Sequence, residues 1–329
     1  MQVLVTGGAG YIGSHTCRSL ARAGYSPVVF DDLSTGHRHN VRWGPLYEGS
    51  LLDPVMILRV LETVRPAAVI HFAAKAYVGE SMEQPERYWR TNVIGSLNLL
   101  EAMVETGTRC LVFSSSCSTY GDVAAVPISE AAPQLPSNVY AETKLTVEKA
   151  IHWYGRLRQL RAAILRYFNA AGCDPEGELG EEHDPETHLL PRAIFSALGR
   201  IPPLQVYGTD WPTGDGTAVR DYVHVADLAE AHLLALERLL QGEEQIVCNL
   251  GTGRGTSVLD VLRAVERASG RPVPWVAAPR RAGDPALLVA DASLAGRLLS
   301  WVPAHPDIET IAAHAWGWFA RREEQGAEV

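Results

Sequence analysis

A glycine-rich segment directly behind the first apolar run constrains the fold of this chain most strongly. The run Thr6-Gly7-Gly8-Ala9-Gly10-Tyr11-Ile12-Gly13 follows a strand predicted over 2–6 and leads into a helix predicted over 14–23. Glycines at this spacing make a tight turn and let the backbone approach a pyrophosphate, while the helix N-terminus faces the phosphates with its free N–H groups. A plain glycine turn is the alternative, but the strand–loop–helix context favours a dinucleotide site.

An acidic pair at the end of the second predicted strand, residues 27–30, points to the same site. Asp31 follows the glycine motif by about 20 residues, the distance at which an acid binds the adenosine ribose 2′-hydroxyl. A carboxylate there also repels the 2′-phosphate of NADP, so Asp31 and Asp32 favour NAD as the cofactor. The alternative is a solvated turn at the strand end.

Short β-branched runs alternate with amphipathic stretches through the first half of the chain. Further strands are predicted over 67–71, 109–113 and 162–167, and helices over 54–65, 88–106 and 139–157. This alternation predicts an α/β fold, a Rossmann-type doubly wound parallel sheet with helices on both faces. A ligand of such a sheet binds beyond the carboxyl ends of the strands, where the strand order reverses.

After about residue 170 this rhythm breaks, and a second, smaller lobe is expected. Polar, glycine-rich loops are predicted over 173–186 and 208–217, helices over 227–240 and 257–270, and a strand over 246–250. We therefore predict an NAD-binding Rossmann domain over 1–170, joined by strands and helices that return from about 219–260. Residues 171–329 then form mainly a C-terminal substrate-binding lobe.

Composition and charge exclude several classes of protein. Hydrophobic residues make up 47 % of the 329 residues and charged residues 20 %, which indicates a globular chain rather than a disordered one. The net charge of −9 argues against a nucleic-acid partner, because no basic stripe is present to neutralise phosphates. We expect neither a signal peptide nor a membrane span, since no apolar run approaches about 20 residues. The five scattered cysteines predict reduced thiols in the cytoplasm, without a disulfide framework or a metal site.

Two segments carry the residue types that the chemistry of such a site needs. Phe113-Ser114-Ser115-Ser116 ends a predicted strand, and Tyr140 and Lys144 share one face of a predicted helix because they are four residues apart. An ammonium beside a phenol lowers the phenol pKa and favours the phenolate as a base, and a serine hydroxyl can relay the substrate proton. Taken alone, Tyr140 and Lys144 could be an ordinary exposed pair on a helix. Their occurrence with the glycine motif, the acidic strand end and the serine run favours a catalytic role.

Eight segments spread over residues 1 to about 300 carry a resemblance to a known family. They are GGAGYIGSHT at 7–16, DDLSTGHR at 31–38, HFAAKAYVGES at 71–81, SSSCSTYG at 114–121, YAETK at 140–144, RYFNAAG at 166–172, VRDYVHVADLA at 219–229 and RRAGDP at 280–285. Together they resemble the UDP-glucose 4-epimerase family of the extended short-chain dehydrogenases/reductases. The glycine motif and YxxxK are common to the superfamily, whereas HFAAKAYVGES, VRDYVHVADLA and RRAGDP are more specific to this branch.

The resemblance implies an isomerase that interconverts UDP-glucose and UDP-galactose through a transient 4-keto sugar, with NAD tightly bound. In this family pattern Tyr140 is the base, Lys144 binds the nicotinamide ribose, and Ser116 lies at the reacting hydroxyl. The implied cofactor contacts are Gly7, Gly10, Tyr11, Ile12, Gly13, Asp31, Asp32, Leu33, Ser34, Thr35, Gly36, Ser50, Leu51, Phe72, Ala73, Lys75, Asn92, Ser114, Tyr140, Lys144 and Phe168. The implied UDP-sugar contacts are Ser116, Tyr140, Asn169, His188, Leu189, Gln205, Tyr207, Arg220, Arg281 and Asp284.

The resemblance further implies a homodimer, and two positions depart from the family pattern. In the dimer, the helix predicted over 88–106 and the Tyr140 helix of each subunit pair into a four-helix bundle. Ser50 stands where the family has an aspartate at the adenine amino group, so the affinity for NAD is open. Leu288 occupies the position that gates the sugar pocket in this family. Leucine is intermediate between a bulky aromatic and a small residue, so the sugar range is also open.

Two other functions stay open at this point. One is an epimerase for another UDP-sugar, such as UDP-N-acetylglucosamine, UDP-xylose or UDP-glucuronate. A 4,6-dehydratase is disfavoured, because Ser116-Cys117-Ser118 holds no carboxylate to assist the loss of water. The second is a non-catalytic NAD-binding regulator, a class of protein that tends to lose the tyrosine or the lysine. Both residues are present here.

Overall fold

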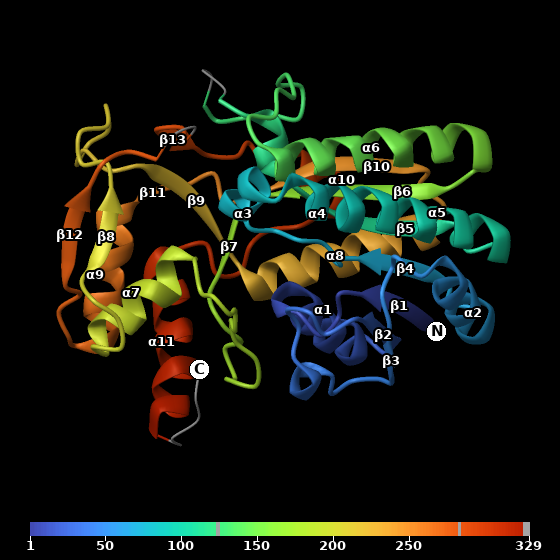
Figure 1. Ribbon diagram of the computed structural model, residues 1–329, viewed down its shortest axis with the longest axis horizontal. Coiled ribbons are helices and arrows are strands. Elements are labelled where there is room, and N and C mark those ends of the chain that lie inside the picture. The colour runs from blue at the N-terminus through green and yellow to red at the C-terminus, as the bar shows by residue number, and fades with distance from the viewer. Residues whose placement is uncertain (123–125, 282–283, 325–329) are drawn as a thin grey trace.

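A seven-stranded parallel sheet forms the larger part of the chain in the computed structural model, which describes residues 1–122, 126–281 and 284–324 (Figure 1). The strands lie in the order β10-β6-β5-β4-β1-β2-β3. Their bounds are β1 (Gln2–Thr6), β2 (Ser26–Asp31), β3 (Leu46–Glu48), β4 (Ala68–His71), β5 (Cys110–Ser116), β6 (Arg161–Tyr167) and β10 (Gln245–Leu250). The predicted doubly wound fold class is confirmed. The strand order reverses between β1 and β4, and the ligand site is expected at the carboxyl ends of those two strands.

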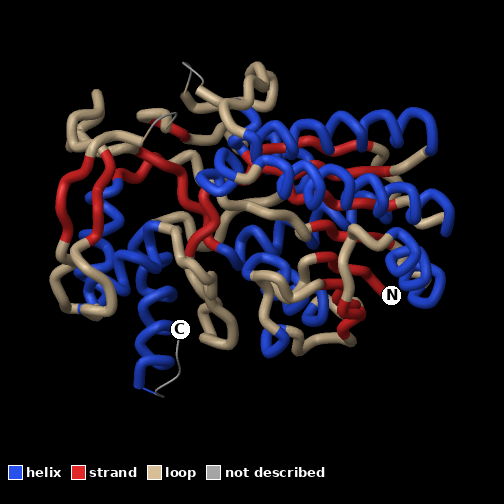
Figure 2. The backbone as a smooth tube through the Cα atoms, in the orientation of Figure 1, coloured by secondary structure: helices blue, strands red, loops and turns tan. Residues whose placement is uncertain are grey.

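Helices cover both faces of this sheet (Figures 1 and 2). Adjacent residues of β1 reach opposite apolar clusters, with Val3 and Val5 in one and Leu4 in the other. Because both faces of such strands are buried, their sequences are continuously apolar and do not alternate between apolar and polar residues. The first face carries α1 (Tyr11–Arg22) and α8 (Val225–Leu240), and the second carries α2 (Pro54–Val64), α5 (Gly95–Thr106) and α6 (Val139–Arg158).

The stretch predicted as one helix over 88–106 is helical, but it starts earlier and contains a wide turn. α4 (Pro85–Tyr88) leads into a π-helical stretch, Trp89–Ile94, and α5 then continues to Thr106. Gly107 ends the helix in the left-handed region at φ 77°, as glycines at helix C-termini commonly do. Single π-helical turns are frequent at functional sites, and this one carries Asn92.

The second half of the chain forms the smaller lobe and also returns to the main sheet. The lobe has its own apolar cluster, which includes Ile194, Val265 and Phe319. α8 and β10 return to the main sheet, whereas β8 pairs with β12, and β9 pairs with β7, β11 and β13. The domain boundary near residue 170 stays a prediction. The remaining bounds are α3 (Val78–Glu83), β7 (Asn169–Ala171), α7 (Leu189–Ala197), β8 (Leu204–Tyr207), β9 (Val219–His224), β11 (Gly255–Ser257), α9 (Val258–Ser269), β12 (Trp275–Ala278), β13 (Leu287–Leu288), α10 (Ser293–Leu299) and α11 (Ile308–Glu324), with short 3-10 turns at Arg38–Asn40 and Cys117–Tyr120.

Two further features bear on the expectations from composition. Within the three described ranges, no helix combines the length and the apolar character needed to cross a membrane. All five cysteines are buried and none forms a disulfide.

Candidate active site at the carboxyl edge of the sheet

The glycine motif packs β1, α1 and the end of β4 closer together than side chains would allow. Gly7 lies at φ 72°, and a Cβ there would come within 2.6 Å of the Ala73 backbone nitrogen. A Cβ on Gly13 would lie 2.1 Å from the Gly7 carbonyl oxygen. Gly10 is the N-cap of α1, and no side chain caps the first turn. The first N–H groups of α1 therefore remain able to bind a pyrophosphate.

The Asp31 carboxylate lies against this glycine loop. It accepts hydrogen bonds from the Ala9 N–H at 3.0 Å and from the Leu33 N–H at 2.9 Å. Burial raises the pKa of Asp31 from its ordinary value, and the two N–H donors oppose that rise. Gly36 also approaches Ala9, since a Cβ on Gly36 would come within 2.9 Å of it. The structure thus brings the predicted adenosine segment 31–36 next to the predicted pyrophosphate loop.

Ser50 follows β3 and lies beside the end of β2. The Gly49 N–H donates to the Asp31 carbonyl at 3.0 Å, which fixes this position. The Ser50 hydroxyl oxygen accepts from the Leu52 N–H at 3.2 Å, and Leu51 is buried. The serine oxygen thus already has one backbone donor, which leaves it less capacity for the adenine amino group than an aspartate would have.

Asn92 connects the predicted cofactor border to the helix that carries Tyr140. Its side-chain oxygen accepts from the Lys75 N–H at 2.8 Å, and its amide donates to the Lys75 carbonyl at 3.0 Å. The same amide donates to the Thr143 hydroxyl at 3.0 Å. Phe72 and Ala73 lie just before this point, where both backbone N–H groups donate to the Thr6 carbonyl. Asn92 therefore holds three predicted contact segments in one arrangement.

Tyr140, Lys144 and Ser116 meet at the end of β5. The Asn138 side chain caps α6 by accepting from the Ala141 N–H at 2.9 Å, so the helix begins immediately before Tyr140. The Ser116 hydroxyl lies close enough to the Tyr140 hydroxyl to oppose the rise in its pKa. The Lys144 ammonium donates to the Ser114 carbonyl at 2.9 Å and lies 5.9 Å from the centroid of the Tyr140 ring. The structure brings together the three residues predicted to be catalytic.

The protonation of this trio differs from the expectation. Burial raises the pKa of Tyr140 well above its ordinary value, the neighbouring Tyr167 raises it further, and the Ser116 hydroxyl opposes the rise. Burial also lowers the pKa of Lys144 to about 8. The net direction of the Tyr140 pKa is therefore upward, and the lowering of that pKa by the Lys144 ammonium stays a prediction. The physical reason is that desolvation dominates, while the ammonium is directed at the Ser114 carbonyl.

Phe168 and Asn169 continue from β6 along the same edge. Phe168 is buried, and its N–H donates to the Leu250 carbonyl at 3.0 Å. The Asn169 side-chain oxygen is buried and has no hydrogen-bond partner among the described residues. A buried polar atom of this kind is costly unless a donor reaches it. The orphaned acceptor therefore fits a bound ligand at this position.

Predicted UDP-sugar contacts gather on the strands and the loop of the lobe. The Arg281 guanidinium lies 4.0 Å from the centroid of the Tyr207 ring, and the Tyr207 hydroxyl donates to Gln205 at 2.7 Å. Arg220 donates to the Val219 carbonyl at 2.9 Å on β9. The Asp284 N–H donates to the Arg281 carbonyl at 3.4 Å, and Leu189 begins α7. Two guanidinium groups in this region can bind a diphosphate through paired hydrogen bonds.

A histidine–glutamate cluster in the loop before α7 includes one predicted contact, His188. Its ring nitrogen is hydrogen-bonded to the Glu181 carboxylate, and His183 lies 3.4 Å from both Glu181 and Glu186. Burial alone would lower the pKa of His183, but hydrogen bonds to the two carboxylates raise it to about 10. The pKa of His188 is also raised, because the Glu181 carboxylate outweighs burial. These donor atoms, all within 4.8 Å of one another, could also hold a metal ion.

Sequence reasoning missed Glu181, His183 and Glu186 as neighbours of the site. The signal for them was the alternation Glu181-Glu182-His183 and Glu186-Thr187-His188 inside a segment that was interpreted only as a polar loop. Tyr11, a predicted cofactor contact, also reaches this region, because its hydroxyl donates to the Gly172 carbonyl at 2.5 Å. That contact ties the glycine loop to the start of the lobe.

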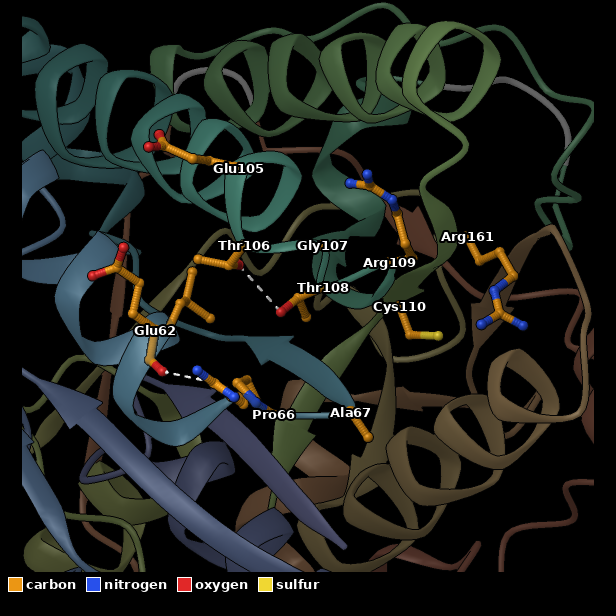
Figure 3. A pocket seen from close by; sticks show the side chains of 12 residues that line it. Glu62, Pro66, Ala67, Glu105, Thr106, Gly107, Thr108, Arg109, Cys110 and Arg161 are labelled. Carbon is orange, nitrogen blue, oxygen red and sulfur yellow. Dashed lines mark hydrogen bonds between the residues drawn. The ribbon is translucent and has the colours of Figure 1, made fainter.

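A hollow of about 850 Å³ lies at the opposite edge of the sheet and holds none of the predicted residues (Figure 3). Arg65, Arg109 and Arg161 line it together with Glu62. Arg65 donates to the Glu62 carbonyl at 3.3 Å, and Arg109 donates to a carbonyl of the last turn of α5 at 3.1 Å. Cations at helix C-termini satisfy free carbonyl groups, so these side chains have a structural role there.

Comparisons with known proteins agree with this geometry. The model of the NAD dependent epimerase/dehydratase family matches residues 3–251. A UDP-glucose 4-epimerase of Rhizobium leguminosarum bv. trifolii is 50 % identical over 322 residues, which cover 98 % of each chain. The crystal structure of a UDP-glucose 4-epimerase from Brucella ovis in complex with NAD superposes with a TM-score of 0.95 at 51 % identity, covering 97 % of this chain and 98 % of that one. A UDP-glucose-4-epimerase from Stenotrophomonas maltophila, with bound NAD and formylated UDP-arabinopyranose, gives a TM-score of 0.95 at 40 % identity, covering 99 % and 100 %.

Proposed function

The chain belongs to the NAD dependent epimerase/dehydratase family, and from that membership and its site we propose that it is a UDP-glucose 4-epimerase. It interconverts UDP-glucose and UDP-galactose by inverting C4 through a transient 4-keto sugar. The observation that carries this proposal is the convergence of Tyr140, Ser116 and Lys144 beside the glycine loop. The absence of net redox change means that the cofactor stays bound through each cycle.

The residues present fit NAD as the cofactor. The uncapped first turn of α1 and the close packing at Gly7 and Gly13 provide a backbone surface for the pyrophosphate. Asp31 offers a carboxylate to the adenosine ribose, and Lys144 an ammonium to the nicotinamide ribose. When bound, NAD supplies the reversible hydride acceptor of the reaction and a positive charge that favours anionic groups in the site.

Tyr140 and Ser116 move the proton of the sugar 4-hydroxyl. The Tyr140 oxygen removes this proton in one half-reaction and returns it in the other, directly or through the neighbouring Ser116 hydroxyl. Burial excludes water from the site, since Ser116 is 9 % and Lys144 4 % exposed. Exclusion of water protects the keto sugar while it turns.

The lobe holds the uridine diphosphate while the sugar turns. Arg220 and Arg281 neutralise the diphosphate. The Asn169 side-chain oxygen accepts a hydrogen bond at the sugar end, because this buried atom lacks a partner among the described residues. Binding energy remote from C4 keeps the intermediate in place and leaves the sugar free to rotate about its diphosphate link.

The first experiment is to incubate the purified protein with UDP-galactose without added cofactor. Formation of UDP-glucose, followed by chromatography, with no growth of the reduced-nicotinamide absorbance, is the expected result. It would also establish that NAD is retained through purification. No conversion even after NAD is supplied would contradict the proposal, and UDP-xylose, UDP-glucuronate and the N-acetylated UDP-sugars would then be assayed in the same way.

The sugar range depends on Leu288 in this proposal. Leu288 lies on β13, beside Arg220 of β9, and is half-buried against the apolar cluster of the main sheet. Leu288→Tyr narrows the space, so it should spare UDP-galactose turnover and remove any activity on UDP-N-acetylglucosamine. Equal loss of both activities would contradict a gating role for this residue.

A homodimer and a cytoplasmic location are further parts of the proposal. Trp89, Ile94, Trp153 and Leu157 are 38–68 % exposed, and they lie on the π-helical stretch before α5 and on α6. Pairing these helices with a second copy would bury them. Light scattering should give the mass of a dimer, and the double variant Trp153→Glu, Leu157→Glu that of a monomer. The unpaired buried cysteines support a reducing compartment, which cell fractionation would test.

A further inference from the structure

A buried ion pair lies one helical turn beyond Lys144, and the reaction described above does not use it. Glu148 and Arg166 are 5 % and 6 % exposed. Arg166 Nη2 lies 2.6 Å from Glu148 Oε2, and Arg166 Nε lies 3.0 Å from Oε1. Because buried ion pairs give little net stability over apolar packing, stability alone is a weak reason for placing one beside a catalytic lysine.

One face of α6 is attached to three consecutive serines at the end of β5. The attachment points on the helix follow one another at intervals of four residues, so they share a face. The Glu148 contact is a hydrogen bond of 2.5 Å from a serine hydroxyl to Oε1. Two of the three contacts are hydrogen bonds, from Lys144 to the Ser114 carbonyl and from Ser115 to Glu148. In the third, the Ser116 hydroxyl lies beside the Tyr140 hydroxyl and opposes the rise in its pKa.

The Glu148–Arg166 pair is fixed on its far side as well. Gln134 donates to Glu148 Oε2 at 3.0 Å. Arg166 donates to the Tyr120 hydroxyl at 3.1 Å, and that hydroxyl donates to Asn249 of β10 at 2.7 Å. Both charges therefore have well-defined positions relative to Lys144, and neither can turn away without breaking several buried hydrogen bonds.

We propose that Glu148, clamped by Arg166 and Ser115, is a positioning residue that keeps Lys144 charged and directed at the Ser114 carbonyl. Burial lowers the pKa of Lys144 to about 8, and the Glu148 carboxylate opposes that decrease. Without it, Lys144 would lose its proton within the physiological range. The catalytic consequence rests on the proposed function, in which the Lys144 ammonium binds the nicotinamide ribose.

Apart from Tyr140, which is the base in the proposed reaction, the other ionisable groups around Lys144 stay neutral near pH 8. Burial and the Lys144 charge together lower the pKa of His71 on β4 to about 3. Burial raises the pKa of Tyr140, and it raises the pKa of Tyr167 on β6 and of Cys117 to about 12. Among the described residues packed here, Glu148 and Arg166 are therefore the fixed charges that act on the ammonium.

The composition of the chain allows a direct test, because the whole sequence contains three lysines, Lys75, Lys144 and Lys149. Protein labelled with ¹³Cε-lysine, carrying its retained cofactor, is titrated by NMR, and Lys75→Arg and Lys149→Arg assign the signals. In Glu148→Gln the Lys144 pKa should decrease by about one unit, because the anion is lost and the Arg166 cation remains.

The reciprocal variant gives the opposite sign. Arg166→Gln leaves the Glu148 anion uncompensated, so the Lys144 pKa should increase by about one unit. Loss of packing alone cannot shift the two variants in opposite directions. An unchanged Lys144 pKa in Glu148→Gln, or a shift of the same sign in both variants, would overturn the inference. If Glu148→Gln does not fold, the expected increase of the Lys144 pKa in Arg166→Gln tests the inference by itself.

Two controls separate electrostatic from structural effects. Ser115→Ala keeps both charges, and the Lys144 pKa should stay within about 0.3 units. Asp227→Asn changes a buried carboxylate that accepts from the backbone N–H groups of Ala304 and His305, so it should lower the melting temperature without moving Lys144. A shift as large in Asp227→Asn as in Glu148→Gln would overturn the inference.

Turnover provides the second readout. The kcat of Glu148→Gln should be about tenfold lower relative to wild type at pH 8.5 than at pH 6.5, with KM for the UDP-sugar within about twofold. A uniform loss across this range would overturn the catalytic consequence. The NMR titration needs no turnover, so an inactive wild type would contradict the proposed function and leave the positioning of Lys144 separately testable.

Discussion

The residues proposed to react and the residues proposed to bind the UDP-sugar lie in different surroundings. On the main sheet, Lys144, Ser116 and Asn92 are 9 % exposed or less, and each is hydrogen-bonded to its neighbours. On the lobe, Gln205 and Arg281 are exposed, and β12 shows three exposed residues out of four. Proton and hydride transfer need fixed distances, whereas a long anionic ligand can be held by exposed side chains. We therefore expect changes on the sheet to act on kcat and changes on the lobe to act on KM.

Removal of the base should give the largest effect. Tyr140→Phe keeps the ring but loses the hydroxyl, and kcat should fall by about 10²–10⁴-fold, while KM and the melting temperature change little. Initial rates with UDP-galactose and a thermal melt provide the measurement. A kcat above a tenth of the wild-type value would contradict the assignment of the chemistry to the main sheet, because the lobe would then have to supply the base.

The next largest effect should come from the glycine loop. In Gly13→Ala the new Cβ would lie 2.1 Å from the Gly7 carbonyl oxygen, and backbone cannot move aside easily. We expect a loss of roughly 1–3 kcal/mol in unfolding free energy and loss of NAD during purification. Gly214→Ala on the lobe is the control, because a Cβ there meets nothing within 4 Å. Equal unfolding free energies of the two variants would show that the edge of the main sheet accommodates the added Cβ at Gly13 despite its close packing.

A lobe arginine should change binding and leave chemistry intact. Arg281→Ala removes a guanidinium that stacks on Tyr207 at 4.0 Å, and KM for the UDP-sugar should rise by about tenfold with kcat within about threefold. Arg281→Lys should recover part of the affinity, since it keeps the charge and loses the paired donors. A decrease in kcat at unchanged KM would contradict the division of labour between the two regions.

The histidine–glutamate loop between the regions should give the smallest and most pH-dependent effect. The pKa of His183 is raised to about 10 in the folded chain, above an ordinary value of about 6.5. Its stabilisation is therefore fully present below pH about 6.5 and is lost as pH rises through about 10. We expect His183→Gln to melt a few degrees below wild type at pH 6 and at the same temperature near pH 10. A difference that grows with pH would contradict the charged pairing.

Local patterns in the sequence predicted the sheet well and the lobe poorly. The strands of the main sheet have apolar runs bounded by glycine or helical segments, so their type could be read from a few residues. β8 and β12 pair across the 67 residues between Tyr207 and Trp275, and α11 packs on α9 and α7. Such elements owe their structure to distant contacts, which periodicity does not report.

The candidate site shows the same division. The sequence placed Tyr140, Lys144 and Ser116 together, because helix spacing and strand ends are local facts. It could not give the direction of the Tyr140 pKa, because desolvation depends on everything packed around the phenol. It also missed Glu148, a charged residue on a helix for which a solvent-exposed position is the ordinary expectation.

The contact between α6 and the serines of β5 has a consequence for how such a site can change over time. Four helical residues rise about 6 Å and two strand residues about 6.6 Å, so Tyr140 and Lys144 match the spacing of Ser116 and Ser114 almost without adjustment. Replacing one side chain keeps this match in spacing. Inserting or deleting one residue between Tyr140 and Lys144 rotates one of them by about 100° around the helix axis relative to the other, so the match is lost. Proteins with this fold can therefore evolve longer loops that suit other sugars, but the number of residues between Tyr140 and Lys144 cannot change.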